Sequence, residues 1–154
     1  MGASYFHVQR LTGRAPARTF GATAVMSALL TILEQIKARP GMFFGGGDRA
    51  RSIQTLHAFI MGFQCGQGPS GQPGDLDFFT EWVAAHYHAL AEGRDSFHMI
   101  LEHAGGDEQK AFDEFFRVLP DFLRERREIG RDGILSRFSD IQDELLKAFE
   151  KDLK

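Results

Sequence analysis

The spacing of apolar residues is the feature of this sequence that most restricts its fold. Between residues 108 and 123, large apolar side chains recur at intervals of three and four: Phe112, Phe115, Phe116, Leu119 and Leu123. This interval places them on one face of an α-helix, whereas a half-buried strand needs strict alternation. Such alternation is absent from the sequence, and β-branched residues are sparse. The sequence therefore predicts an all-α protein.

The same period, with the glycines and prolines that interrupt it, divides the chain into about six helices. We expect helices over about 27–39, 48–65 and 76–91, from Ser96 to the glycines at 105–106, from Asp107 to the glycines at 130 and 133, and over 134–152. Ser27, Asp48, Ser96 and Asp107 are interpreted as N-caps, since short polar side chains accept hydrogen bonds from free helix N–H groups. Residues 42–44 are expected to be extended, and Pro120 to kink or briefly break its helix.

The chain length fits a single domain with one core, a bundle of these helices. We assign the helical domain to residues 26–154, because Met26 opens the first regular helix pattern. Residues 1–25 show no hydrophobic period and are interpreted as a disordered or extended N-terminal extension. Residues 66–74 contain four glycines and two prolines, and we expect a flexible loop there.

The charge is distributed unevenly along the chain. Residues 1–51 hold seven Lys and Arg against two acids, whereas residues 52–154 hold eleven against nineteen. An acidic body repels the phosphate backbone of nucleic acids and suits a basic protein partner, although charge for solubility alone explains it equally well. We therefore expect a protein partner and no nucleic acid.

Cysteine content and hydropathy indicate the compartment. The single cysteine, Cys65, excludes an internal disulfide and favours a reducing, cytoplasmic setting. The longest apolar-biased run, residues 20–33, contains Thr and Ser and is too short to cross a bilayer. We expect a cytoplasmic protein without membrane contact.

Histidines are the most concentrated potential metal ligands. Five lie within fifty residues: His57, His86, His88, His98 and His103. A metal site on a helix needs ligands three or four residues apart, and these spacings are poor matches. We therefore interpret them as core or surface residues, with His86 on an apolar stripe.

No pattern in the sequence indicates catalysis. Asp75 and Asp77 flank the start of an expected helix, where carboxylates are stabilising without doing chemistry. The glycines at 45–47 precede a helix as phosphate-binding loops do, but their spacing differs and Asp48 would repel a phosphate. We expect a turn there, and a protein that is not an enzyme and needs no metal or cofactor.

One short segment resembles a nucleotide-binding family. Residues 39–45, RPGMFFG, are similar to the RPGMYIG segment of DNA gyrase B-type ATPases. Those ATPases also carry a DxGxG motif on an α/β sandwich, whereas residues 131–134 read RDGI and no strands are expected. We set the ATPase interpretation aside.

A longer resemblance covers most of residues 27–123. The chain follows a layout of small bacterial proteins, RPGMYLG, LxxFIxGY, FxxWVAxxY and DExxAFxxFF, although Phe63 replaces the tyrosine. The matching segments are residues 29–45, LHAFIMGF at 56–63, FFTEWVAAHY at 78–87 and GDEQKAFDEFFRVLPDF at 106–122. Proteins of this layout resemble the immunity proteins of polymorphic-toxin and contact-dependent inhibition systems.

The resemblance implies a non-catalytic cytoplasmic protein that neutralises a cognate toxin domain by covering it. Charged and aromatic surface residues are the expected contacts. Together with the loop at 66–74, we select Arg39, Asp75, Asp77, Trp82, Asp113, Asp121 and Glu125.

The alternative hypothesis is a small-molecule-binding or regulatory helical domain. It predicts an enclosed pocket near His57, Trp82 and His86, where polar groups meet the aromatic core.

Overall fold

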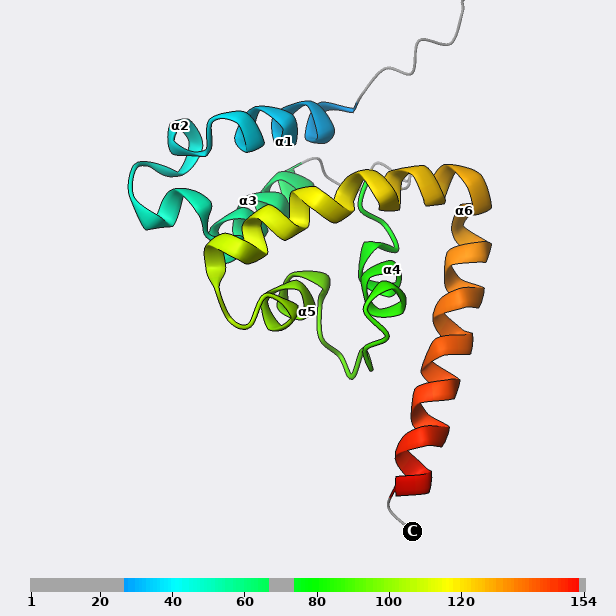
Figure 1. Ribbon diagram of the computed structural model, residues 1–154. Helices are drawn as coiled ribbons and strands as arrows, with labels where there is room; N and C mark the ends of the chain where they lie inside the picture. Colours follow the sequence, from blue (N-terminus) through cyan, green and yellow to red (C-terminus); the bar gives the residue numbers. More distant parts are fainter. Residues whose placement is uncertain (1–26, 67–73, 153–154) are drawn as a thin grey trace, which may run out of the picture.

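The computed structural model describes residues 27–66 and 74–152, and it confirms the all-α prediction (Figure 1). Within these residues no strand is present. The helices are α1 (Ala28–Ala38), α2 (Pro40–Phe44), α3 (Ile53–Gly66), α4 (Phe79–His86), α5 (Ser96–His103) and α6 (Glu108–Asp152), with a 3-10 helix, η1 (Asp48–Arg51). The expected extension at 1–25 and almost all of the expected loop at 66–74 lie outside the described residues.

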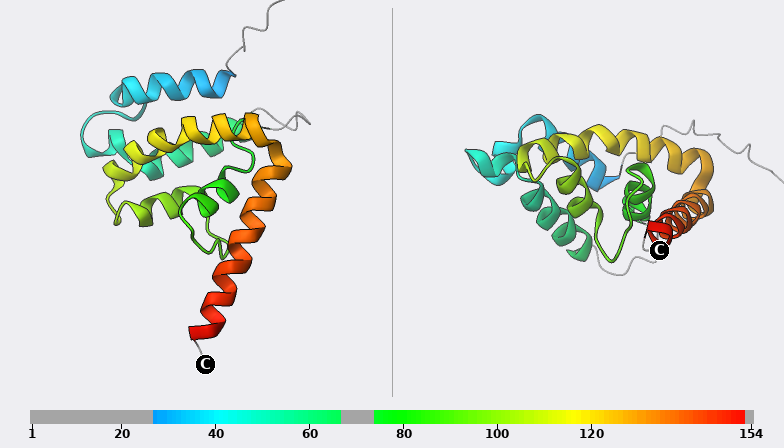
Figure 2. Two further views of the ribbon diagram at one scale, coloured as in Figure 1. Left: turned by 45° about the vertical axis from the view of Figure 1, so that its right-hand side comes forward. Right: turned by 60° about the horizontal axis from the view of Figure 1, so that its bottom comes forward.

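The long helix α6 organises the fold. Its first half runs between α1 on one side and α3, α4 and α5 on the other, and its second half turns sharply and descends beside α4 (Figures 1 and 2). In the same views α1 runs antiparallel to the first half of α6. No helix of the described part of the chain combines the length and the apolar composition that crossing a membrane requires.

Aromatic side chains fill the space between α4 and α6. Phe79, Trp82, Phe115 and Phe122 are all buried. The Phe79 ring meets those of Phe115 and Phe122 edge to face, with centroids 5.6 and 5.0 Å apart. Rings prefer this geometry because a positive edge meets a negative face, and each ring removes a large apolar area from water. The spacing of apolar residues in the sequence thus identifies the core.

The region around residues 40–55 differs from the prediction. Residues 40–44 form the short helix α2 rather than an extended segment, because Pro40 ends α1 and then occupies the first position of α2, where no N–H is needed. Asp48 begins η1 and not the long helix. The N-terminus of α3 is capped instead by Ser52, which accepts from Thr55 N at 3.2 Å, and by Glu108, which accepts from Gln54 N at 3.2 Å.

The helix α4 begins later than expected, and α5 begins one residue earlier. Residues 75–78 form a turn, in which the Asp77 carboxylate accepts from Gly74 N at 2.9 Å and Phe78 has a left-handed backbone, so α4 starts only at Phe79. The N-cap of α5 is Asp95 and not Ser96, since the Asp95 carboxylate accepts from His98 N at 2.8 Å. Neighbouring short polar residues compete for such caps.

The fifth and sixth expected helices form one helix with a bend. The backbone remains helical through Pro120, so the expected break there is wrong. The bend lies at Gly130, whose φ of 68° and ψ of −173° are accessible only to glycine. At the far end of α6, Ile141 is buried but Phe149 is 57% exposed, although the spacing predicts both to face inward. The short helix α4 ends before it can cover Phe149.

Candidate functional site

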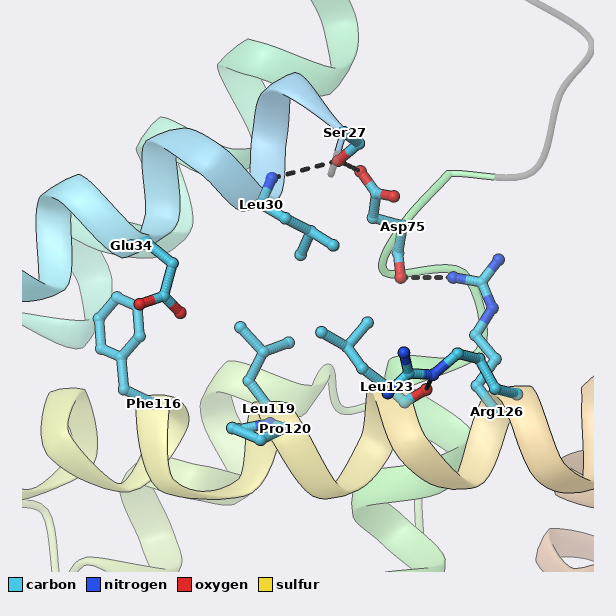
Figure 3. Close-up of a pocket in the computed structure, with 10 residues that line it drawn as sticks. Ser27, Leu30, Glu34, Asp75, Phe116, Leu119, Pro120, Leu123 and Arg126 are labelled. Atoms are coloured by element: carbon cyan, nitrogen blue, oxygen red, sulfur yellow. Dashed lines mark hydrogen bonds between the residues drawn. The ribbon is translucent and has the colours of Figure 1, made fainter. Parts of the chain in front are cut away.

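A groove of about 570 Å³ separates α1 from the first half of α6 (Figure 3). Its floor is apolar and is formed by Phe116, Leu119, Pro120 and Leu123 of α6, and Leu30 of α1 faces them. The floor residues are three or four positions apart, so they occupy one face of the helix. Phe116 and Leu119 also belong to the buried core, so the floor continues the core, and Pro120 and Leu123 extend it to the surface.

One end of the groove is closed by polar contacts among three segments. Ser27 caps α1 by accepting from Leu30 N at 3.2 Å, and its hydroxyl donates to the Asp75 carboxylate. The Arg126 guanidinium donates to the Asp75 backbone carbonyl (Figure 3). These contacts join α1 and α6 to the turn before α4, and they fix the width of the groove at this end.

Charged residues line both ends of the groove, and Asp75, whose carboxylate accepts from Ser27, shares one end with Arg126 (Figure 3). Glu34 lies beside Phe116, and Arg126 lies beyond Leu123 (Figure 3). Arg127 follows Arg126 on α6 and also lines the groove, and it completes a set of three with Glu34 and Arg126. Within the described residues these three side chains form no ion pair. Arg127 donates its Nε–H to the Leu123 carbonyl at 3.1 Å, and its other N–H groups are free of ion pairs.

Pro120 adds a polar group to the apolar floor. A proline has no N–H, so the carbonyl four residues earlier, that of Phe116, receives no hydrogen bond from the helix. Pro120 is exposed and lines the groove, which places that carbonyl on the groove side of α6. The floor therefore carries one backbone acceptor that an occupant could satisfy.

Two of the selected residues, Trp82 and Glu125, contact each other on the opposite side of α6. Trp82 Nε1 donates to Glu125 at 2.8 Å, and Arg137 forms an ion pair with the same carboxylate. Burial raises the pKa of Glu125, but the hydrogen bonds from Trp82 and Arg137 outweigh it and hold this pKa below its ordinary value. Trp82 is 2% exposed, so it supports the fold and does not reach the surface.

A second paired cluster adjoins this contact. Tyr87 donates to Glu114 at 2.6 Å, and Arg117 donates two hydrogen bonds of 2.6 Å to the same carboxylate. The bonds from Arg117, then those from Tyr87, lower the pKa of Glu114 to about 2. Burial and the Glu114 contact raise the pKa of Tyr87. The arrangement resembles a structural ion pair because every group has its partner.

His86 lies between the two clusters and stacks on Trp82, with the ring centroids 4.6 Å apart. Burial, together with the nearby Arg117 and Arg137 guanidiniums, lowers the pKa of His86. The lowered pKa favours the neutral imidazole, which suits a histidine stacked on an indole.

The other selected residues are dispersed. Asp75 lies in the groove, whereas Asp77 belongs to the turn before α4. Arg39 is an exposed residue at the junction of α1 and α2. The selected set thus does not form one site, and only Asp75 belongs to the groove.

The two remaining acids, Asp113 and Asp121, are held in ion pairs. Asp113 pairs with Arg51 and Asp121 pairs with Arg124 at 2.8 Å. Arg117, which lies between them on α6, forms its ion pair with Glu114.

The pocket predicted by the alternative hypothesis is not assembled from its three residues. His57 stacks on Phe97 with centroids 4.2 Å apart and lines a small pocket of about 120 Å³ between α3, α4 and α5. Trp82 and His86 lie outside that pocket, next to α6. In the described ranges no three His, Cys, Asp or Glu side chains are grouped as metal ligands.

The groove residues Leu30, Glu34, Arg126 and Arg127 were not selected from the sequence. A signal for the groove exists in the sequence, because Pro120 adds an apolar residue beside Leu119 and Leu123 on α6. That signal does not reveal that α1 stands opposite and leaves a gap, since the distance between two helices depends on side chains far apart in the chain.

These features define the class of molecule: an all-α protein with an apolar surface groove whose charged ends are unpaired within the described residues. Comparison of the chain with protein-family models, with curated proteins and with solved structures finds no match.

Proposed function

We propose that this chain is a non-catalytic binding protein of the bacterial cytoplasm and that it neutralises a cognate toxin domain by covering part of its surface. The observation that carries the proposal is the groove between α1 and α6, which offers apolar area and unpaired charges together. Interfaces of high affinity are built from such combinations, in which apolar contacts supply energy and charges supply orientation.

The rest of the described surface supports a basic or mixed-charge protein as the partner. Together, the described residues 27–66 and 74–152 contain twenty-one Asp and Glu against fourteen Lys and Arg. An excess of negative charge accelerates encounter with a positively charged protein, and it disfavours nucleic acid. The first half of α6 is uninterrupted helix, so the groove is preformed and an occupant can bind it without refolding.

Co-expression tests this proposal. Toxin domains encoded beside the gene are expressed in a sensitive strain with and without this protein, and growth and co-purification are measured. We expect one domain to be rescued and to co-purify. Leu123→Glu, which places a charge in the groove, should abolish both effects, whereas Glu128→Gln on the exposed side of α6 should preserve them. The absence of both rescue and co-purification would refute the proposal.

The groove also favours a second function, the binding of a small molecule. Its volume of about 570 Å³ lies within the range of roughly 300–1,000 Å³ that is typical of ligand pockets. Thermal denaturation with a panel of nucleotides, amino acids and carboxylic acids would test this function. A ligand that raises the Tm of the protein but not of Leu123→Glu would support it, and a flat response would exclude the ligands tested.

A further inference from the structure

We propose that the groove binds one amphipathic α-helical segment of the partner, with its basic N-terminal end beside Glu34 and its acidic C-terminal end beside Arg126 and Arg127. This inference rests on the proposed function, because it names the part of a protein partner that the groove would accept. Three properties of the groove specify the occupant: its length, its volume and the placement of its charges.

The length of the floor matches about three helical turns. The groove follows α6 from Phe116 to Arg127, and at a rise of about 1.5 Å per residue this distance is roughly 16 Å. A helix of that length and about 10 Å diameter occupies roughly 1,300 Å³, more than twice the groove volume of about 570 Å³. The groove therefore admits the apolar ridge of a helix and leaves its backbone and polar face outside.

The floor determines which side chains form that ridge. Leu119 and Leu123 are one turn apart, and Leu30 faces them from α1 (Figure 3). A surface of this kind packs against Leu, Ile or Met at positions i, i+3 or i+4, and i+7 of the occupant. The acceptor carbonyl of Phe116 beside Pro120 adds a place for one donor, such as a Ser, Thr or Gln side chain.

The charges determine the direction of the segment. Glu34 at one end is free of ion pairs, as are Arg126 and Arg127 at the other, within the described residues. A segment with Lys or Arg in its first turn and Asp or Glu in its last turn complements both ends. The helix dipole of such a segment, positive at the N-terminus, has the same orientation. The Asp75 carboxylate shares the Arg126 end but already accepts from the Ser27 hydroxyl, so this end carries two cations against one anion. The reverse direction would place an acidic turn beside Glu34 and a basic turn beside the two arginines.

A peptide selection with charge reversal tests the inference. A display library of twelve-residue segments in a helical frame is selected on the full-length protein, with counter-selection on Leu123→Glu. We expect enriched peptides to combine the apolar spacing with a basic first turn and an acidic last turn. Affinity of a synthetic consensus peptide is then measured by fluorescence polarisation against the protein and its charge variants.

The expected pattern is specific to the groove. Arg127→Glu should weaken peptide binding at least tenfold, and a peptide with Lys in its last turn should recover most of that loss. Arg124→Glu is the matched control, because Arg124 is on the same helix but pairs with Asp121 outside the groove. It should leave the affinity within about twofold. All variants are compared by circular dichroism to confirm that they fold.

Several outcomes would overturn the inference. These are a failure to enrich peptides over Leu123→Glu, a consensus with the opposite charge order, or an affinity that Arg127→Glu leaves unchanged. Self-association that Leu123→Glu abolishes would identify a second copy as the occupant instead. If a toxin domain is rescued while no peptide binds the groove, only this inference fails; if neither occurs, the proposed function fails as well.

Discussion

The two sides of the first half of α6 differ in whether their charged residues form ion pairs. On the side facing α4, Glu114 is bound by Tyr87 and Arg117, and Glu125 is bound by Trp82 and Arg137. On the side facing α1, the charged residues of the groove have no ion pairs within the described residues. A paired charge is satisfied within the fold, whereas an unpaired one beside apolar surface is available to another molecule.

The difference separates residues that hold the protein together from residues that could bind a partner. A charged or aromatic residue in a sequence suggests either role, and burial and partners decide between them. Trp82 satisfies its N–H within the protein, whereas Arg127 forms no ion pair with any residue that the structure describes. We therefore expect loss of a side chain on the α4 side to lower stability, and substitution of a charged groove residue such as Arg127 to change binding with little effect on stability.

The largest expected effect is on the α4 side. Trp82→Ala removes a buried indole and leaves Glu125 without that donor, and we expect a loss of about 3–5 kcal/mol in the free energy of unfolding. Leu123→Ala on the groove side removes a half-buried side chain, and its loss should be only about 1 kcal/mol. Urea denaturation measures the loss in unfolding free energy for both variants, provided that their m-values equal that of the unmodified protein. Equal losses would contradict the distinction between the two sides.

The bend in α6 is the next place to test, because it brings the second half of the helix to the α4 side. Gly130→Ala should destabilise the protein by about 1–3 kcal/mol, since the backbone there lies in a region that other residues avoid. No neighbouring atom would obstruct the added methyl group, so the cost is conformational. Gly41→Ala is the control, because its backbone is ordinary and its surroundings are open. It should be neutral or slightly stabilising, and a comparable loss there would contradict the explanation.

On the groove side, Pro120→Ala should stabilise the protein. Alanine supplies the N–H that the Phe116 carbonyl lacks, and a proline within a helix costs about 3 kcal/mol or more. The more flexible unfolded chain offsets part of this gain, so we expect a net increase of about 1–2 kcal/mol. Pro40→Ala should bring no gain, because Pro40 occupies the first position of α2, where its missing N–H costs nothing. A loss of stability in Pro120→Ala would contradict the explanation, because it would mean that the missing N–H at Pro120 costs the helix nothing.

The sequence contains enough information for the architecture and too little for the groove. Apolar spacing predicts the all-α fold and the buried residues of α6 correctly, because burial of one helix face is a local property of the pattern. Helix ends are predicted less well. Ser52 and Glu108 are 56 residues apart, yet together they cap α3. A pattern within one segment cannot reveal such a partner.

The same reason explains why Trp82 and Glu125 were selected as surface contacts. Tryptophan is enriched at interfaces and a carboxylate can steer a basic partner, and 43 positions separate the two residues in the chain. Only the packing of α4 on α6 shows that they satisfy each other. Conversely, Arg126 and Arg127 belong to a run of charges that is unremarkable in sequence, and their place in the groove follows from the position of α1.

The smallest effect concerns the pH dependence of the α4 side. The hydrogen bonds from Arg117 lower the pKa of Glu114 most, burial partly opposes them, and the hydrogen bond from Tyr87 lowers it further. The resulting pKa is about 2, below the ordinary value of 4.5. A carboxyl with a lowered pKa stabilises the folded state fully above pH 4.5, and this contribution disappears as the pH falls toward 2. Since Arg117 is largely exposed, we discount the contribution for solvent screening to about 1 kcal/mol.

The measurement compares the protein with Glu114→Gln by urea denaturation between pH 7 and pH 2. The difference in unfolding free energy should be about 1 kcal/mol at pH 7 and should shrink between pH 4.5 and pH 2. Glu128→Gln is the control on an exposed position of the same helix, and it should show almost no difference at any pH. A difference for Glu114→Gln that stays constant down to pH 2 would mean that the carboxylate charge does not stabilise this side of α6, and that its contacts act only through shape and neutral hydrogen bonds.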